Sequence, residues 1–537
     1  MQIKPLLIAF LVLVQVAAFA QLSPDTVAMI DKIMNRYPDS GPGAQIAIGR
    51  NGQTIYSTVK GMADLEHAVA LTKMSKIEAG SVSKQFTAAA ILLLEQQGKL
   101  SLDDDVRRYI PELPHYGHKI TIRHLMQHTS GLRDWGSIAE IAGWPRGTKA
   151  YTNDDALYII TLQKALNNKP GDEYIYSNSG YTLMTHIVQR VSGMSLAAFT
   201  KKYIFEPAGM KNTEWRDDYK RVVKDRAIAY SRNSSGYVTN MPNEDTYGHG
   251  GLLTTAEDLL VWNNYYLNGK LGGVSLLSRQ LQLTPLNNGK ANDYAAGLVV
   301  DSSEGYKIIT HSGATASYRA NLDHFPQLGL SIAWISNTSQ SDVSNTASLV
   351  RQVFVKPSTS LQSEASKASF TDLASFQPYI GAYKENKTGA GIRIVIKDSV
   401  LTSEQNGKLT LIAPHKAMVG KAQIFFQEKP RRFTMINGAG DTIQYIGVDT
   451  ANLTGNRINE YAGLYASDET ESKLSVIVKE GKLYIKRRVN ETLLTSVYKD
   501  GFELPAGDVY FERDKKGKIS KLFISISRAR KVEFKKL

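Results

Sequence analysis

Ser81-Val-Ser-Lys-Gln-Phe-Thr-Ala-Ala-Ala-Ile-Leu-Leu-Leu94 is the stretch of sequence from which the fold can be inferred. From Phe86 onward it is apolar nearly all round, which predicts a buried helix, and Gly98 stands where a helix C-cap is expected. Ser81 and Lys84 lie three residues apart and therefore share one face of the first turn. Because burial without a partner penalises a charged amine, Lys84 is pressed towards neutrality and can act as a base. The stretch thus predicts a hydroxyl and its base at the start of a buried helix.

The Ser-x-x-Lys spacing is weak evidence by itself, because Ser57…Lys60 and Ser496…Lys499 also satisfy it. Only Ser81 opens an apolar helical run, and the start of a helix offers backbone N–H groups to a developing oxyanion. A structural interpretation stays open, in which the serine caps the helix and the lysine extends its ammonium to solvent. Two further motifs favour the catalytic interpretation.

The first of these motifs is Tyr176-Ser-Asn178, which follows the turn signal Lys169-Pro-Gly171 and is therefore expected on a loop. A phenol beside a lysine can relay a proton, and an amide can hold a substrate carbonyl or the lysine itself. Two other Tyr-x-Asn strings begin at Tyr151 and Tyr266. We interpret the former as a helix cap and the latter as the last turn of a helix.

The second motif is His311-Ser-Gly313, which directly follows the strand-like run 306–310. A glycine here lets substrate backbone approach the strand closely, and the N–H of Ala314 can serve as a second oxyanion donor. His-x-Gly also occurs at His115 and His249, neither of which follows such a run. The alternative for the third motif is a glycine-marked strand kink beside a surface histidine.

Outside the motifs, the pattern of residues 21–355 predicts an α/β (α+β) domain. Residues 44–50 and 53–59 flank Asn51-Gly52, the strongest short hairpin signal. Residues 331–336 form a mostly buried strand in this interpretation, and 344–355 a closing helix. This order of elements predicts helices packed on a central antiparallel sheet, with strands from both ends of the domain in that sheet.

The last third of the chain has a different sequence pattern, made of a polar stretch and then short strands and turns. Residues 356–371 are Ser-rich and polar, as expected of a linker. Beyond them, Tyr379-Ile-Gly-Ala-Tyr383 recurs 82 residues later as Tyr461-Ala-Gly-Leu-Tyr465, within two series of short alternating strands. We therefore expect two small all-β, barrel-like domains, at 372–456 and 457–537.

Composition and the first residues bear on location. Residues 1–20 combine a charged start, an apolar middle and the small-residue end Ala18-Phe-Ala20, which predicts a cleaved signal peptide. We therefore expect a periplasmic or secreted protein without a stable membrane span after cleavage. The chain lacks cysteine, which excludes disulfides and thiolate metal sites, and its net charge of +13 comes without any nucleic-acid motif.

Together, Ser-Val-Ser-Lys-Gln-Phe-Thr-Ala, Tyr-Ser-Asn and His-Ser-Gly, in this order, resemble the serine β-lactamase and penicillin-binding-protein superfamily. The nearest branch is the class C β-lactamase-like group with its D-aminopeptidases, D,D-carboxypeptidases and esterases. The resemblance covers about residues 25–355 and implies a transpeptidase-like fold. It implies Ser81 as the acylated nucleophile, Lys84 as its base, Tyr176 as proton relay and Asn178 as a substrate-orienting amide, with no cofactor or metal.

One departure from the family pattern concerns the third motif. Many β-lactamases and carboxypeptidases have Lys-Thr-Gly there, and the lysine helps to bind a substrate carboxylate. His311 is a weaker, pH-dependent cation near neutrality, which argues against recognition of β-lactams and C-terminal carboxylates. A His-x-Gly motif followed by two β-barrels resembles the D-aminopeptidases, which take a free amino end. Arg319 is either a replacement for the lysine charge or a surface residue.

A metal site is not expected. His124 and His128 are four residues apart, but no glutamate follows His124, and we expect a structural hydrogen-bonding role for His128. The sequence predicts an exported serine hydrolase that forms an acyl-enzyme. Its expected substrates are small molecules or short peptides, such as D-amino-acid peptides or peptidoglycan-derived fragments. The alternatives are a small-ester esterase, a β-lactamase, a penicillin-binding sensor that does not turn over, and a binding scaffold.

Overall fold

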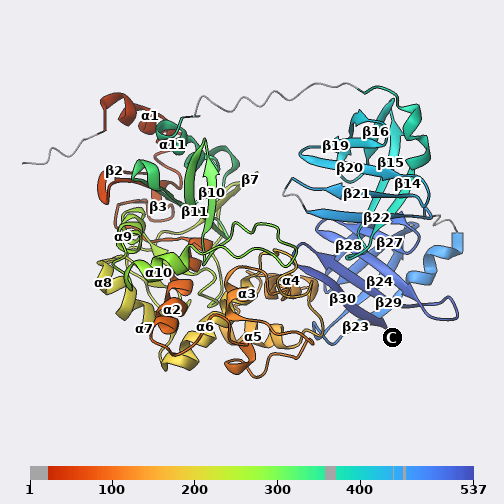
Figure 1. The fold of residues 1–537 in the computed structure, drawn as a ribbon, viewed down its shortest axis with the longest axis horizontal. Coiled ribbons are helices and arrows are strands. Elements are labelled where there is room, and N and C mark those ends of the chain that lie inside the picture. Colours follow the sequence, from red (N-terminus) through yellow and green to blue (C-terminus); the bar gives the residue numbers. More distant parts are fainter. Residues whose placement is uncertain (1–21, 357–369, 439–440, 452–454) are drawn as a thin grey trace, which may run out of the picture.

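The computed structural model describes residues 22–356, 370–438, 441–451 and 455–537. An α/β part formed by residues 22–356 is followed by two β-rich bodies, drawn in cyan and blue in Figure 1. The signal peptide expected at 1–20 and nearly all of the linker expected at 356–371 lie outside the described residues. None of the helices in the described ranges combines the length and the apolar character that a membrane crossing requires.

A six-stranded antiparallel sheet organises the α/β part, in the order β10-β11-β12-β13-β1-β2. Its strands are β1 (Ala44–Arg50), β2 (Gln53–Lys60), β10 (Val299–Ser303), β11 (Tyr306–Thr315), β12 (Tyr318–Phe325) and β13 (Leu330–Ser336). The expected hairpin is β1–β2, and Asn51 and Gly52 adopt the positive φ values of 50° and 80° that its turn requires. Ile46 of β1 faces Trp334 of β13, so both ends of the α/β part meet in this sheet, as predicted.

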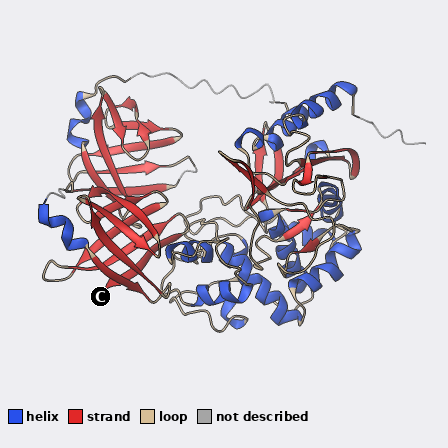
Figure 2. Ribbon diagram, turned by 180° about the vertical axis from the view of Figure 1, so that it is seen from behind, coloured by secondary structure: helices blue, strands red, loops and turns tan. Residues whose placement is uncertain are grey.

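Helices cover both faces of this sheet (Figure 2). One face carries α1 and α11, whose apolar side chains share a core cluster with Ile48 and Ile332, and the other carries α9 with the remaining helices behind it. The helices are α1 (Pro24–Met34), α2 (Lys84–Gln96), α3 (Ile122–Met126), α4 (Trp135–Ile141), α5 (Asn153–Thr161), α6 (Asn178–Ser192), α7 (Leu196–Thr200), α8 (Glu206–Ala208), α9 (Ala256–Leu267), α10 (Gly273–Gln280) and α11 (Thr346–Phe354).

Three small antiparallel sheets complete this part of the chain. They are β3 (Met62–Asp64) with β4 (Val69–Ala70), β5 (Ile77–Glu78) with β9 (Leu252–Thr254) and β6 (Glu214–Trp215), and β7 (Tyr230–Asn233) with β8 (Gly236–Thr239). Strand β5 leads directly into the segment that contains Ser81, and β9 follows Gly251. The second of these sheets therefore fixes two segments that meet at the functional site.

Helix α2 is buried nearly all round, as its sequence predicts, and Gly98 follows its end with a φ of 68°. It begins at Lys84 rather than at Ser81, however, because Gly80–Ser83 forms a tighter 3-10 turn, η1. Strand β11 packs against this turn, and a Cβ at Gly80 would stand 2.6 Å from the Ala314 nitrogen. The serine therefore lies on a turn between a strand and a buried helix.

The two β-rich bodies differ in closure. Residues 463–536 form a closed eight-stranded barrel. The first body is a nine-stranded sheet in which no ladder between described residues joins the end strands, β17 (Gly407–Lys408) and β18 (Thr410–Ala413). Only Leu409 separates these two strands along the chain, so the sheet curls back on itself. In both bodies the repeated motif makes the same contact, because Tyr383 donates to the Tyr379 carbonyl and Tyr465 to the Tyr461 carbonyl.

The strands of the first body are β14 (Gly381–Glu385), β15 (Gly391–Lys397), β16 (Val400–Ser403), β17 (Gly407–Lys408), β18 (Thr410–Ala413), β19 (Lys416–Val419), β20 (Ala422–Gln427), β21 (Arg432–Ile436) and β22 (Thr442–Val448). Those of the barrel are β23 (Gly463–Ser467), β24 (Ser472–Lys479), β25 (Lys482–Arg487), β26 (Asn490–Tyr498), β27 (Gly501–Leu504), β28 (Gly507–Arg513), β29 (Ile519–Ile526) and β30 (Ala529–Lys536).

The closed barrel packs directly on the α/β part, beside α4 and α5 (Figure 1). Ile138 and Ile141 of α4 belong to the apolar core cluster of the barrel. A buried ion pair of 2.6 Å joins Arg133 to Glu469 across this interface. The sequence predicts the barrel as a separate module, and its packing brings the β29–β30 turn to the functional site.

Candidate active site

The predicted site residues converge on one pocket of about 310 Å³. Its wall includes Ser81, Tyr176, Asn178, His311 and Ala314, which come from η1, the segment before α6, α6 itself and β11. Three motifs that together span more than 200 residues of the chain thus meet around Ser81, as the sequence predicts.

Lys84 lies fully buried beneath Ser81 and has three oxygen neighbours. Its Nζ is 3.1 Å from Ser81 Oγ, 3.0 Å from Asn178 Oδ1 and 2.6 Å from the His249 carbonyl oxygen. A neutral amine has two N–H groups for the amide and carbonyl oxygens, which leaves its lone pair for the Ser81 hydroxyl proton. The arrangement therefore fits a base that is aimed at Ser81.

The electrostatic surroundings of Lys84 favour this neutral form. Burial lowers the pKa of Lys84 well below its ordinary value, and the positive charges of Arg528 and Arg146 lower it further, against the opposing charge of Asp134. The sequence predicts that burial makes the Lys84 amine neutral. The structure agrees, because the three partners of Lys84 are uncharged oxygens and no carboxylate among the described residues contacts it directly.

Tyr176 stands beside both Ser81 and Lys84. Lys84 Nζ is 4.8 Å from the centre of its ring, and the centre of the His128 ring lies 4.1 Å from it in a tilted arrangement. Burial raises the pKa of Tyr176, and a side-chain hydrogen bond with Ser81 partly offsets this. The phenol is therefore protonated near neutrality, so it can pass a proton on but is a weaker candidate than Lys84 for the initial base.

Asn178 is held by its backbone. Its N–H donates to Asp134 Oδ2 at 2.7 Å, while Asp134 Oδ1 accepts the Ser137 N–H and caps α4. The preceding Ser177 N–H donates to His128 Nδ1 at 3.2 Å, the structural role expected of His128. His124 Nδ1 accepts a backbone N–H in the capping box of α3, so the two histidines serve separate backbone groups.

The third motif differs from the sequence expectation in the charge of His311. His311 is only 5% exposed and lies between the Tyr294 hydroxyl at Nε2 and the Ser312 carbonyl at Nδ1. Burial is the main cause that lowers the pKa of His311 to about 4. The expectation of a pH-dependent cation near neutrality is therefore wrong, because the buried ring is neutral there.

Gly313 has a role within the chain that the sequence did not indicate. A Cβ at this position would stand 1.9 Å from the Ala79 carbonyl oxygen and 3.1 Å from the Ser81 nitrogen. The missing side chain lets β11 approach the η1 turn of the same chain. Ala314, the next residue, is exposed on the pocket wall, which leaves it available as the second oxyanion donor that the sequence suggests.

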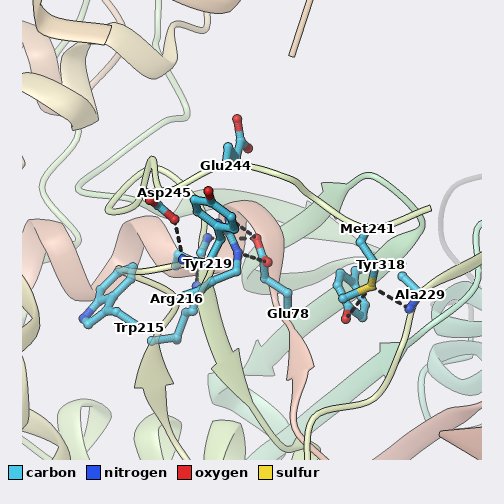
Figure 3. A network of polar contacts seen from close by, with 12 residues as sticks. Glu78, Trp215, Arg216, Tyr219, Ala229, Met241, Glu244, Asp245 and Tyr318 are labelled. Carbon is cyan, nitrogen blue, oxygen red and sulfur yellow. Dashed lines mark hydrogen bonds and ion pairs between the residues drawn. The ribbon is translucent and has the colours of Figure 1, made fainter. Parts of the chain in front are cut away.

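Three groups around the pocket were missed in the sequence analysis. The first is Glu78 with Arg216, a pair in which each side chain is 1% exposed and Arg216 Nε donates to Glu78 Oε2 at 2.9 Å (Figure 3). Glu78 Oε1 also accepts the Gly251 N–H. This pair fixes the turn after His249, whose carbonyl holds Lys84, and no local motif marks it.

The other two groups are arginines in the pocket wall, Arg146 and Arg528. Arg146 Nε donates to Glu244 Oε2 at 3.0 Å, so its charge is paired. Arg528, from the turn between β29 and β30, places its guanidinium 4.7 Å from the centre of the Tyr176 ring. Arg319 donates instead to carbonyls of its own turn and does not line the pocket, so it does not replace the missing lysine.

Comparison with known proteins places this geometry in a family. Residues 30–353 match the family model described as Beta-lactamase. The chain belongs to the Beta-lactamase family. Within this family it is 29% identical over 390 residues to "Penicillin-binding protein 4*" of Bacillus subtilis (strain 168), a match that covers 68% of this chain and 84% of the relative.

Two longer matches include the β-rich bodies. This chain is 24% identical over 523 residues to a "D-aminopeptidase" of Brucella anthropi, and the match covers 93% of this chain and 96% of the relative. It shares its fold with the octameric penicillin-binding protein homologue from Pyrococcus abyssi, with a TM-score of 0.54 and 20% identity over 95% of this chain and 99% of that one. The chain is thus a serine hydrolase of the Beta-lactamase family, of the amidase and peptidase kind.

Proposed function

We propose that this chain is an exported hydrolase that cleaves amide bonds in short D-amino-acid peptides, including peptidoglycan-derived fragments, through an acyl-enzyme on Ser81. The observation that carries the proposal is the 3.1 Å contact between Ser81 Oγ and the fully buried Lys84 Nζ. The substrate class is supported by similarity to a D-aminopeptidase and a penicillin-binding protein. Export is supported by the signal-like pattern of residues 1–20.

The first half of the reaction acylates the enzyme. Ser81 Oγ forms a bond to the substrate carbonyl carbon while its proton passes to Lys84 Nζ. The N–H groups of Ser81 and Ala314 stabilise the oxyanion, and Asn178 orients the substrate amide. When the C–N bond breaks, the proton reaches the leaving nitrogen through Tyr176, and the amine departs.

The second half releases the acyl group. A water oxygen attacks the ester carbon, and its proton passes to the neutral Lys84, directly or through Tyr176. The bond between the carbon and Ser81 Oγ then breaks, and the proton returns to Oγ, which restores the free enzyme. No cofactor or metal takes part in this proposal.

The test is mass spectrometry of the intact protein after mixing with D-alanyl p-nitroanilide and, separately, with a fluorescent penicillin. A transient adduct on Ser81 with release of nitroaniline supports the proposal, and Ser81→Ala should abolish both. Ser57→Ala is the matched control, because it removes the serine of a second Ser-x-x-Lys string whose hydroxyl bonds to Glu257.

Each alternative has its own outcome in the same experiment. A permanent penicillin adduct without turnover identifies a penicillin-binding sensor, and penicillin hydrolysis identifies a β-lactamase. Cleavage of small esters but not of D-amides identifies an esterase. No adduct with either probe, or unchanged activity in Ser81→Ala, contradicts the proposal.

A further inference from the structure

The pocket lacks the usual cation at the third motif. His311 is buried with both ring nitrogens occupied by Tyr294 and Ser312, and Arg319 is turned to carbonyls of its own turn. Any positive charge that faces a substrate must therefore come from another part of the chain.

Arg528 is in a position to supply that charge. It lines the Ser81 pocket, is half-buried, and lies over the same Tyr176 ring that contacts Lys84. Its backbone is fixed, because its carbonyl accepts the Asp134 N–H at 3.1 Å and the Asn167 side-chain amide at 3.0 Å. The guanidinium is thus carried by an anchored turn, which limits the entropy lost on binding.

The pairing of the neighbouring arginines sets Arg528 apart. Arg133 pairs with Glu469, Arg146 with Glu244, and Arg530 with Glu173. Within the described ranges, no carboxylate lies within ion-pair distance of Arg528. A partly desolvated guanidinium without an anion is costly, and a ligand carboxylate removes that cost through two parallel hydrogen bonds.

The carboxylate of Asp134 does not neutralise the positive charge that Arg528 brings to the pocket. Asp134 is 3% exposed, is absent from the pocket wall, and accepts backbone N–H bonds from Ser137 and Asn178. A substrate in the pocket therefore meets Arg528 rather than a carboxylate. The positive charge of Arg528 would repel a substrate ammonium group at that end of the pocket.

We propose that Arg528, from the turn between β29 and β30, binds a carboxylate of the substrate and so determines specificity at the Ser81 pocket. The inference rests on the proposed function and refines it. It favours peptides that keep a free carboxylate near the scissile bond over peptides presented by a free amino end. The closed barrel thereby supplies the charge that the third motif lacks.

The experiment compares two substrates that differ in charge alone, acetyl-D-alanyl-D-alanine and its C-terminal amide. We expect the wild type to prefer the carboxylate, and Arg528→Ala to lower the ratio of the two kcat/KM values by about 10- to 100-fold. Arg528→Lys should restore part of the ratio because it keeps a point charge. If neither peptide turns over, the acylation rates of benzylpenicillin and its methyl ester on Ser81 provide the same ratio.

Arg530→Ala is the matched control, since it removes an equal charge from the same hairpin but from an arginine that pairs with Glu173. We expect it to leave the ratio within about twofold of wild type, because screening weakens distant charges. An unchanged ratio in Arg528→Ala, an equal fall for both substrates, or an equal effect of Arg530→Ala overturns the inference while the hydrolase proposal stands. Absence of any Ser81 adduct in the wild type overturns both.

Discussion

Gly313→Ala tests whether the closeness of β11 to the nucleophile turn sets the geometry of catalysis. The new Cβ would stand 1.9 Å from the Ala79 carbonyl oxygen, whereas real Cβ contacts essentially never fall below 3.0 Å. The strand or the η1 turn must therefore move by about 1 Å. Displacements of that size in a reacting group cost roughly 100-fold in rate. Overpacking of a buried contact destabilises by about 1–3 kcal/mol.

The assay is kcat/KM for D-alanyl p-nitroanilide together with the thermal melting temperature. We expect activity to fall by about 100-fold, in a protein that still melts cooperatively at a lower temperature. Gly49→Ala is the control, since it lies in β1 of the same sheet and its Cβ would meet nothing closer than 3.4 Å. Near-wild-type activity and melting of Gly313→Ala would refute the argument that this glycine sets the position of Ser81.

Two further predictions concern stability. His311 has a folded pKa of about 4 against an ordinary 6.5. The unfolded chain therefore binds the extra proton between these values, and stability should fall as pH drops from about 6.5 towards 4, by up to ~3 kcal/mol from this residue. His311→Gln should flatten the melting temperature against pH in this window, and an identical slope in the variant would argue against a buried neutral ring. Arg133→Met should destabilise by about 3–5 kcal/mol because it leaves Glu469 buried and unpaired, and Arg133→Met with Glu469→Leu should recover much of the loss. Denaturant unfolding measures both, and a double variant no more stable than the single one would contradict this account.

Much of the site could be predicted because its central parts are local. Ser81 and Lys84 are three residues apart, so their proximity follows from the turn that joins them, although that turn is a 3-10 helix before α2. The hairpin at Asn51-Gly52 and the 82-residue repeat are likewise determined by neighbouring residues. In these cases short-range backbone preference and hydrophobic pattern specify the structure.

Short-range residue patterns are enough to specify the local units, namely the nucleophile turn, the buried α2, the sheet strands and the β repeats. Which distant groups surround these units depends on how the units pack against one another. The neutrality of His311 results from burial by Tyr294 and its neighbours, the His249 carbonyl reaches Lys84 because Glu78 holds the adjacent turn, and Arg528 enters the pocket because the barrel docks on α4. Such contacts depend on desolvation and on packing between segments hundreds of residues apart, for which a single sequence carries no periodic or spacing signal.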